Sequence, residues 1–376
     1  MRILHFYKTF FPNTTGGMEQ TIHQLARTAA QHGVETDILS LSRKVRHQQS
    51  VTHADGYTAH TVPQIIEISS MGCSLAVFKR FAQLAAHADV IHYHFPWPWM
   101  DLVHFVTRVN KPTIVTYQSD IIRQKHALKF YSPLMHRFLK SVDYIVATSP
   151  NYCKSSLVLQ NYKNKTRVIP LGLDRSSYLS PSIDCLNKWR ERLPQPFFLF
   201  VGVLRYYKGL HILLESAIAT EYPIVIAGTG PYEQKLKQQA AALNLTNVIF
   251  LGAITNEDKV ALFSLCYAVV FPSNIRSEAF GLALLEGAMF GKPMISCEIG
   301  TGTSFINQHG QTGLTIAPND AHALNKAMKF LWSHPEEAAL MGQRAEARYW
   351  QLFTAEHMTT EYLSLYREAI ATHKDI

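Results

Sequence analysis

The sequence predicts an α/β protein of two domains, each built on a parallel β-sheet covered by helices. Two observations lead to this prediction. Short runs of β-branched and aromatic residues alternate with segments whose apolar residues recur at helical spacing, and this alternation occurs in two successive series. The chain also has 376 residues, 47% of them hydrophobic, which is more than one hydrophobic core usually supports.

The predicted strands are short and are separated by helical segments, as in repeated βαβ units. The first series places strands at residues 3–7, 34–41, 90–94, 113–117 and 144–148. The second series places strands at residues 197–203, 224–227, 248–251, 268–271, 294–297 and 314–316. Each series therefore predicts one Rossmann-like domain with a parallel sheet.

The domain boundary is expected near residue 180, because residues 170–196 hold four prolines, a glycine and one short helical stretch. We predict an N-terminal domain over 1–180, a second domain over 181–352 and a closing amphipathic helix over 353–376 that crosses back to the first domain. Ligands of open parallel sheets bind at the carboxyl ends of the strands, so the sheets are expected to face each other across a ligand-binding cleft.

Composition excludes several classes of protein. No apolar stretch approaches the roughly 20 residues of a membrane-spanning helix, and the first residues are typical of a strand rather than a signal peptide. The five cysteines are odd in number and far apart, which favours reduced thiols in the cytoplasm. We therefore expect a cytoplasmic protein.

Charge is divided unequally along the chain. Residues 1–190 contain 22 Lys and Arg against 11 Asp and Glu, whereas the remainder contains 14 against 17. A basic half can attract nucleic acid, an anionic membrane or a phosphorylated substrate, or it can simply be a soluble face. Nucleic acid is not expected as a partner, because the basic residues form no stripe interleaved with aromatic residues.

A pair of glycines precedes the first predicted helix, which spans residues 20–31. Gly16 and Gly17 follow the first strand, and a glycine loop at a helix N-terminus can hold a phosphate through its free amides. Such a pair is more often a simple turn. It is also not the G-x-G-x-x-G pattern of dinucleotide binding, which counts against a dehydrogenase.

Two cations follow the first strand of the second domain. Arg205 and Lys208 come after Gly202, between a strand and a helix. Together they can bind a diphosphate and stabilise the charge that grows on it as it leaves. Solvated surface charge is the alternative.

The most specific motif is a pair of glutamates, Glu278 and Glu286, that frame the start of a helix. Glu278 precedes Ala279, Phe280, Gly281 and Leu282, whose backbone amides can face a ligand. Glu286 lies about two turns later in an apolar helix, where an unpaired carboxylate would be costly. Either a ligand hydroxyl or a structural ion pair would account for it.

These motifs together resemble the retaining family 4 glycosyltransferases, whose two-domain architecture is called GT-B. The glycine pair, the two cations, the turn at 228–231 and the glutamate pair occur in the order in which that family has them. The resemblance covers nearly the whole chain. Residues 112–121, 147–152 and 168–174 further resemble bacterial O-antigen and lipopolysaccharide mannosyltransferases.

The resemblance implies a role for each motif. Glu278 and the backbone of 280–282 would hold the donor sugar, Glu286 the nucleotide ribose, and Arg205 with Lys208 the diphosphate. The base would lie near Ile254, and the donor site would also include Gly16, Gly17, Gly202, Gly230 and Ala279. The reacting groups would be Glu278, Arg205, Lys208 and Gln118.

Gln118 departs from the pattern, because that subgroup usually has histidine at this position. In relatives the histidine is thought to position or stabilise the reacting sugar. Glutamine can donate and accept hydrogen bonds but cannot carry a proton at neutral pH. We therefore do not expect Gln118 to act as an acid or base. It can orient a sugar hydroxyl, or it can mark a weakly active enzyme or a different acceptor geometry.

His92 and His94 share one face of a predicted strand that leads to Trp97. No third ligand stands near them in sequence, so packing or substrate contact is favoured over a metal site. His94, Trp97 and Asp120 are the candidate contacts for the acceptor. Tryptophan is suited to sugar stacking and to a membrane interface, and ordinary partial burial of this segment is an equal alternative.

The resemblance implies a retaining hexosyltransferase that needs no metal or other cofactor. GDP-mannose is the first donor to test. The acceptor would be a lipid-linked oligosaccharide of O-antigen or another surface polysaccharide, reached by peripheral contact with the anionic inner face of the cytoplasmic membrane. The alternatives are a nucleotide-sugar-binding protein with little transferase activity, an epimerase on the same fold, and a nicotinamide dehydrogenase.

Overall fold

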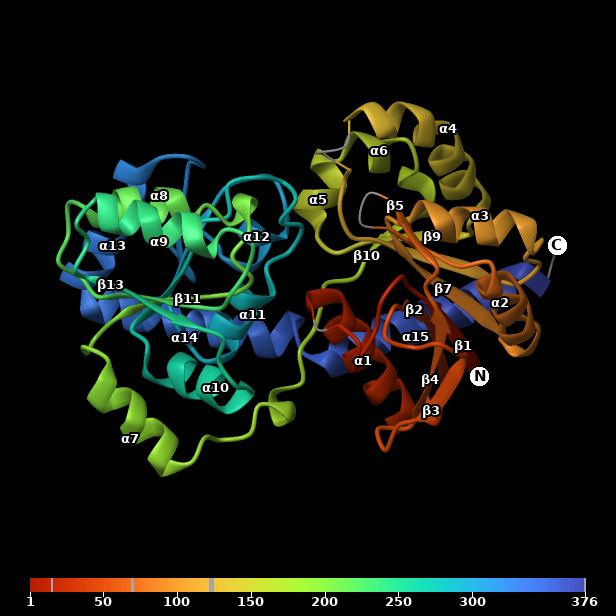
Figure 1. Ribbon diagram of the computed structural model, residues 1–376, viewed down its shortest axis with the longest axis horizontal. Helices are drawn as coiled ribbons and strands as arrows, with labels where there is room; N and C mark the ends of the chain where they lie inside the picture. The colour runs from red at the N-terminus through yellow and green to blue at the C-terminus, as the bar shows by residue number, and fades with distance from the viewer. Residues whose placement is uncertain (15, 69–70, 122–124, 375–376) are drawn as a thin grey trace. The chain divides into compact units, whose positions relative to one another are not determined.

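The computed structural model describes residues 1–14, 16–68, 71–121 and 125–374. The chain divides into two compact units (Figure 1). Unit 1 comprises Met1–Gly172 together with Ala355–Ile376, and unit 2 comprises Leu173–Thr354.

Unit 1 contains an eight-stranded sheet in the order β10-β9-β8-β7-β1-β2-β4-β3. Its strands are β1 (Arg2–Phe6), β2 (Glu35–Ser42), β3 (Gln49–Thr52), β4 (Tyr57–Pro63), β7 (Val90–Phe95), β8 (Thr113–Tyr117), β9 (Tyr144–Ala147) and β10 (Thr166–Val168). Neighbours pair in parallel, apart from β3, which runs antiparallel to β4. A separate hairpin joins β5 (Ile66–Ile68) and β6 (Met71–Cys73).

The helices of unit 1 lie between these strands in the sequence, except for α15 at the C-terminal end. They are α1 (Gly17–Gln31), α2 (Ala76–His87), α3 (Pro98–Val106), α4 (Lys125–Ser141), α5 (Pro150–Ser155), α6 (Leu157–Gln160), the 3-10 turn η1 (Lys163–Lys165) and the final helix α15 (Ala355–Lys374). No helix in the described part of the chain is both long enough and apolar enough to cross a membrane.

Unit 2 contains a six-stranded parallel sheet in the order β13-β12-β11-β14-β15-β16. Its strands are β11 (Phe198–Val201), β12 (Ile224–Ala227), β13 (Val248–Gly252), β14 (Ala268–Phe271), β15 (Met294–Cys297) and β16 (Gly313–Ile316). Its helices are η2 (Arg175–Ser177), α7 (Ile183–Arg192), η3 (Tyr206–Lys208), α8 (Leu210–Ala217), α9 (Glu233–Ala242), α10 (Asn256–Leu265), α11 (Leu282–Met289), α12 (Gly302–Ile306), α13 (Ala321–Ser333) and α14 (Pro335–Leu352). Helices α8 and α9 lie on one side of the sheet, and α7 and α10 lie on the other (Figure 1).

The structure agrees with the predicted strands of both series to within a few residues at their ends. The sequence analysis missed β3, β4, β10 and the β5–β6 hairpin. All residues of β3 are exposed, and Val51 is its one apolar side chain, so this strand has no alternating pattern to detect. β10 and the hairpin strands are only three residues long.

The first unit boundary lies at Gly172 rather than at the predicted 180. The amide of Leu173 donates to the carbonyl of Phe353 at 3.0 Å, and the carbonyl of Leu173 accepts from the Tyr349 hydroxyl at 2.8 Å. These bonds tie the start of the connecting segment to the end of α14, so this segment belongs to unit 2. Unit 2 in turn ends at Thr354, immediately before α15.

Helix α15 packs on the sheet of unit 1 through tyrosines. Tyr362 and Tyr366 are 1% and 0% exposed, and their hydroxyls lie 2.7 Å from Thr116 Oγ1 and from His92 Nδ1. At the surface, the Tyr144 hydroxyl donates to Glu368 at 2.8 Å. The C-terminal segment thus covers the face of unit 1 that carries the histidines of β7.

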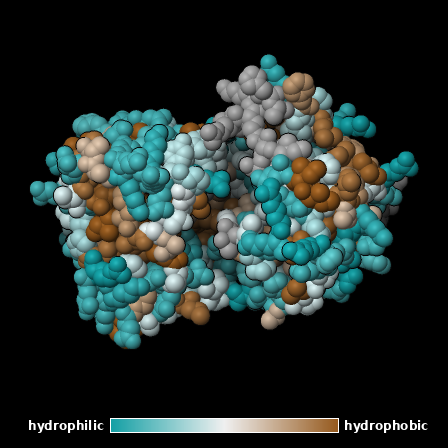
Figure 2. Space-filling view, viewed as in Figure 1, coloured by the Kyte–Doolittle hydropathy of each residue, from teal (hydrophilic) through white to brown (hydrophobic). Residues whose placement is uncertain are grey.

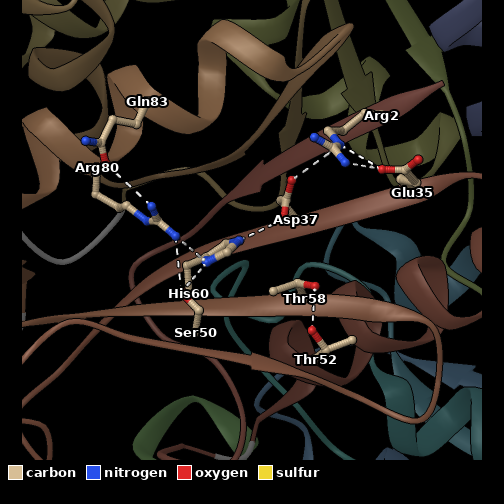
Figure 3. Close-up of polar contacts among 9 residues, drawn as sticks. All are labelled: Arg2, Glu35, Asp37, Ser50, Thr52, Thr58, His60, Arg80 and Gln83. Carbon is tan, nitrogen blue, oxygen red and sulfur yellow. Dashed lines mark hydrogen bonds and ion pairs between the residues drawn. The ribbon is translucent and has the colours of Figure 1, made fainter.

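A polar network joins the edge strands of unit 1 to α2 (Figure 3). His60 Nε2 lies 2.7 Å from Asp37 Oδ1, and His60 Nδ1 lies 2.8 Å from Ser50 Oγ and 2.9 Å from Arg80. Serine, histidine and aspartate also form hydrolytic triads. Here the guanidinium of Arg80 can only donate, so it occupies the acceptor lone pair that a base would need, and the network is structural.

Candidate functional site

In unit 2, the carboxyl ends of β11 and β14 meet because these strands are neighbours in the sheet. The loop after β11 forms η3 and turns at Gly209, which has a φ of 67°. A Cβ atom at Gly209 would lie 1.9 Å from the carbonyl oxygen of Pro272, in the loop after β14. Only glycine permits this approach, which places Lys208 beside the second loop.

Lys208 and Glu278 form an ion pair at this edge. Lys208 Nζ donates to Glu278 Oε2 at 2.5 Å, and the Ser273 hydroxyl donates to the same oxygen at 3.2 Å. The two charged side chains are only 13% and 12% exposed. Each has lost most of its hydration, and the attraction of the opposite charge offsets that loss. The structure therefore brings together a cation and an acid that the sequence placed in one site.

The start of α11 lies directly beyond Glu278. Gly281 has a φ of 97°, and the amides of Phe280, Gly281 and Leu282 donate to no acceptor among the residues that the structure describes. Phe280 is 4% exposed and packs so closely on Gly302 that a Cβ there would lie 2.4 Å from its ring. The predicted row of amides is thus held by packing and is available to an anionic or hydroxylated ligand.

Glu286 is engaged inside unit 2. Its Oε1 accepts from the Tyr178 hydroxyl at 2.8 Å and from Lys259 Nζ at 2.5 Å, and the whole residue is 6% exposed. The structural ion pair that the sequence left open is therefore present. Lys259 and Tyr178 were not predicted from the sequence as partners of Glu286. Lys259 lies on α10, which begins just after Ile254.

The other predicted donor residues occupy loops at the same edge. Arg205 precedes η3 and is exposed, whereas Ile254 and Ala279 are half-buried. Gly202 follows β11, and Gly230 follows β12 and packs against Leu204. Two of these residues adjoin the Lys208–Glu278 pair. The backbone amide of Lys208 donates to the carbonyl of Arg205 at 3.1 Å, and a Cβ atom at Gly202 would lie 4.0 Å from Cε of Lys208.

The glycine loop of unit 1 contains a carboxylate of its own. Glu19 is 8% exposed, and its Oε1 accepts from the hydroxyls of Thr9 and Thr14 at 2.8 and 2.9 Å. A Cβ at Gly16, the residue before α1, would lie 2.7 Å from Glu19 Oε2. Negative charge thus already occupies the helix start where the sequence predicts a phosphate. Thr15 of this loop lies outside the described residues.

Gln118 follows β8 and is hydrogen-bonded to a buried histidine. Its Nε2 lies 3.3 Å from His94 Nδ1, and His94 Nε2 lies 3.0 Å from His5 Nδ1. The second histidine of β7, His92, instead lies 2.7 Å from Thr116 on β8. The sequence analysis did not single out His5, which lies beside His92 in the parallel register of β1 and β7.

His5, His92 and His94 form the one group of possible metal ligands within the described residues. The rings of His92 and His94 stack at 4.4 Å with an interplanar angle of 25°, and one nitrogen from each of the three rings lies within 4.8 Å of the others. Both nitrogens of His92 and both of His94 already have hydrogen-bond partners. This geometry favours packing over coordination.

The candidate acceptor residues need correction. Trp97 is fully buried, and its indole nitrogen donates to the carbonyl of Gly72 at 3.1 Å, so it offers no face to a sugar or a membrane. His94 is 1% exposed and can act only through Gln118. Asp120 accepts hydrogen bonds from the hydroxyls of Tyr117 and Ser156, which hold the loop after β8.

Two open hollows lie at the opposite edges of the sheets. One, of about 640 Å³, is lined by Met1, His32 and Val34 at the amino ends of β1 and β2. The other, of about 500 Å³, is lined by Pro194, Pro223 and Asn247, before β11, β12 and β13. Ligands of parallel sheets bind at the carboxyl ends, so neither hollow competes with the Lys208–Glu278 site.

The fold and the site together define a class of protein. Residues 15–177 match the family model described as Glycosyltransferase Family 4, and residues 185–348 match the model described as Glycosyl transferases group 1. The chain therefore belongs to the family 4 glycosyltransferases and is a glycosyltransferase. The predicted family and enzyme class are confirmed.

Particular relatives lie close in sequence. The D-rhamnosyltransferase WbpZ of Pseudomonas aeruginosa is 57% identical over 355 residues, which cover 94% of this chain and 93% of WbpZ. The O-antigen chain mannosyltransferase C of Escherichia coli is 48% identical over 369 residues, which cover 97% of this chain and 98% of that protein.

Solved structures share the fold. Sucrose-phosphate synthase from Thermosynechococcus elongatus aligns with a TM-score of 0.81 at 22% identity and covers 99% of both chains. Anabaena HepE in complex with UDP aligns with a TM-score of 0.76 at 18% identity, over 98% of this chain and 100% of HepE. These similarities confirm the predicted GT-B fold class.

The buried histidines generate a prediction about pH. Burial lowers the pKa of His5 to about 3 and lowers those of His92 and His94 well below 6.5. The unfolded chain therefore binds more protons below pH 6.5, and stability should be lost as the pH falls from 6.5 towards the lower folded-state pKa values. Relative to pH 7, we expect each buried histidine to lower the free energy of unfolding at pH 5 by about 2 kcal/mol.

Denaturant unfolding at pH 7 and pH 5 measures this loss. A His92→Gln variant should lose about 2 kcal/mol less than the wild type between the two pH values, because it has one buried histidine fewer. Equal losses in both proteins would contradict the assignment of a neutral His92.

Proposed function

We propose that the chain is a retaining hexosyltransferase that takes a sugar from a nucleoside diphosphate donor held by unit 2. The observation that supports this is the partly buried Lys208–Glu278 pair beside the amides of 280–282. A diphosphate can accept from Lys208 and Arg205, while a sugar hydroxyl can donate to Glu278. Glu286 would accept from the ribose through its second oxygen, with Lys259 and Tyr178 holding its first.

The proposed reaction exchanges one bond at the anomeric carbon for another. The bond from that carbon to the diphosphate oxygen breaks, and a bond to the acceptor hydroxyl oxygen forms on the same face of the sugar. The hydroxyl proton passes to the departing phosphate, so the products are a nucleoside diphosphate and a glycoside. Lys208 and Arg205 would neutralise the charge on the leaving group, so we propose that the reaction needs no divalent metal.

The first donors to test are GDP-mannose and GDP-D-rhamnose. WbpZ is named a D-rhamnosyltransferase and the Escherichia coli relative a mannosyltransferase. D-rhamnose is 6-deoxymannose, so the two sugars share the manno configuration and differ only at carbon 6. We propose a manno-configured donor and, from the name of the second relative, a lipid-linked glycan of O-antigen synthesis as the acceptor.

Single substitutions of Lys208, Glu278 and Arg205 test the transferase assignment. We expect Lys208→Ala, Arg205→Ala and Glu278→Ala to lower kcat with saturating donor, the Lys208 and Glu278 changes by about a hundredfold, because each removes a group that meets the transferring charge. Turnover is measured with a chelator present, and the wild type should remain active.

Lys237→Ala is the matched control, because Lys237 forms an exposed ion pair with Glu233 on α9 and should change kcat less than twofold. Unchanged turnover in all three site variants would refute the assignment. Donor binding without any turnover in the wild type would instead indicate a nucleotide-sugar-binding protein.

We further propose that unit 1 meets an anionic membrane through a cationic surface formed by basic residues of α4, α5 and η1. Residues 125–170 contain eight Lys or Arg and one Asp. Lys165 Nζ donates to the carbonyl of Lys140 at 2.8 Å, and His136 Nδ1 lies 2.9 Å from the Tyr162 hydroxyl, so α4 is tied to the segment after α6 (Figure 1).

The same stretch of the chain, residues 125–170, also carries exposed apolar side chains. Phe130 on α4 is 89% exposed and Leu157 on α6 is 85% exposed. On the face drawn in Figure 2, unit 1 shows hydrophobic residues beside hydrophilic ones. Lysine and arginine supply attraction to anionic lipids, and the apolar side chains can enter the headgroup region.

Binding to vesicles that contain phosphatidylglycerol tests the cationic surface. We expect the triple change Arg137→Glu, Lys154→Glu and Lys163→Glu to weaken binding at least about a hundredfold, since each cation near such a membrane contributes about 1 kcal/mol. The matched control reverses three exposed cations of unit 2, Lys235, Lys326 and Lys329, and should bind as the wild type. Binding that is indifferent to salt would contradict the proposal.

A further inference from the structure

Gln118 is the outermost member of a row of hydrogen-bonded side chains that enters the core of unit 1. The row runs from Gln118 after β8 to His94 on β7 and then to His5 on β1, with contacts of 3.3 and 3.0 Å. Gln118 is 9% exposed, whereas both histidines are 1% exposed. Only the first side chain of the row can therefore meet a ligand.

The direction of the hydrogen bonds follows from the chemistry of the amide. An amide nitrogen only donates, so Nδ1 of His94 accepts from Gln118 and the proton of His94 lies on Nε2. That proton is donated to Nδ1 of His5, which leaves the proton of His5 on its own Nε2. Every contact in the row then has one donor and one acceptor, with no charge on either ring.

Packing fixes the row in place. The backbone amide of Gln118 donates to the carbonyl of Phe95 at 3.2 Å, and the ring of His92 stacks on His94 at 4.4 Å. Tyr7 contacts the edge of the His94 ring, with centroids 5.9 Å apart. Meanwhile no residue that the structure describes donates to Oε1 of Gln118, so that oxygen has its accepting capacity unused.

We propose that His94, supported by His5, is a positioning residue for Gln118: it binds the amide nitrogen and leaves the amide oxygen to accept a hydrogen bond from a hydroxyl of a sugar substrate. This inference rests on the proposed transferase function. It makes position 118 a hydrogen-bond acceptor of fixed orientation, whereas a histidine there would be free to donate or accept according to its tautomer and protonation.

Burial supports a contact that does not titrate in the working range. It lowers the pKa of His5 to about 3 and that of His94 well below its ordinary value. The neighbouring groups are neutral at pH 7 as well. Burial lowers the pKa of His92 on β7. Burial also raises the pKa values of Tyr7, which follows β1, and of Tyr362 and Tyr366 on α15. Gln118 therefore meets its ligand as an uncharged acceptor.

Two conservative changes of His94 separate its two hydrogen bonds. Asparagine places a polar atom near the position of Nδ1 and can still bind Gln118, whereas glutamine places one near the position of Nε2 and can still bind His5. We expect His94→Asn to retain kcat within about threefold and His94→Gln to lower kcat about tenfold, which is the loss of one hydrogen bond of about 1.4 kcal/mol.

The double variant tests whether His94 acts through Gln118. Gln118→Ala should also lower kcat about tenfold, and combining it with His94→Gln should cause no further loss, because the group that His94 positions is already absent. Tyr366→Phe is the control for core disruption: it removes a buried hydrogen bond to His92 Nδ1 and leaves every member of the row in place, so it should lower the melting temperature but leave kcat within about twofold.

The outcomes are distinguishable. A hundredfold loss in the double variant, or a His94→Asn enzyme as slow as His94→Gln, would overturn the positioning role while leaving the transferase assignment intact. If His94→Gln does not fold, the comparison of His94→Asn with the wild type still decides, since loss of kcat in a folded His94→Asn enzyme contradicts the proposal. Failure of the wild type to transfer any sugar would instead refute the proposed function.

Discussion

The donor site of unit 2 depends on the pairing of Lys208 with Glu278. Both side chains are almost buried, and neither charge is tolerable there without the other. The pairing is possible because β11 and β14 are neighbours and because Gly209 lets the loop after β11 touch the carbonyl of Pro272. In the absence of a donor, the ion pair keeps a cation and an acid oriented together, and a bound diphosphate would take Lys208 from the carboxylate. The site is in this sense organised before its ligand arrives.

Unit 1 is constrained differently, by polar groups inside an apolar core. Three histidines on β1 and β7 are buried without a carboxylate partner, so they are held neutral and must satisfy one another, Gln118, Thr116 and the tyrosines of α15. The last helix of the chain is needed for this, because Tyr366 supplies the partner of His92. A glutamine at position 118 completes the row without adding a titratable group. The glycine loop likewise contains an acid, Glu19, whose negative charge would repel a phosphate bound there.

Periodicity predicted the sheets well because each parallel strand is a short buried run followed by a helix, as in Ile224–Ala227 and Met294–Cys297. It could not show β3, whose residues are all exposed. The family resemblance implied that Lys208 and Glu278 share the donor site, and the sheet order brings them together because β11 and β14 are neighbours. Sequence motifs could not provide Lys259 for Glu286 or His5 for His94, because these partners come from different elements and only the folded packing brings them together. For Trp97 the residue type left acceptor contact, membrane contact and burial open, and the fold places it in the core.

The most direct test of the Lys208–Glu278 account is calorimetric titration with the nucleoside diphosphate that binds most tightly among GDP, UDP, dTDP and ADP. If the carboxylate of Glu278 and the diphosphate compete for the ammonium group of Lys208, Lys208→Ala should weaken nucleotide binding about tenfold or more. Glu278→Gln should strengthen nucleotide binding several-fold, because it removes the competing carboxylate and its repulsion of the diphosphate. Unchanged affinity in Lys208→Ala, or weaker binding in Glu278→Gln, would contradict the account.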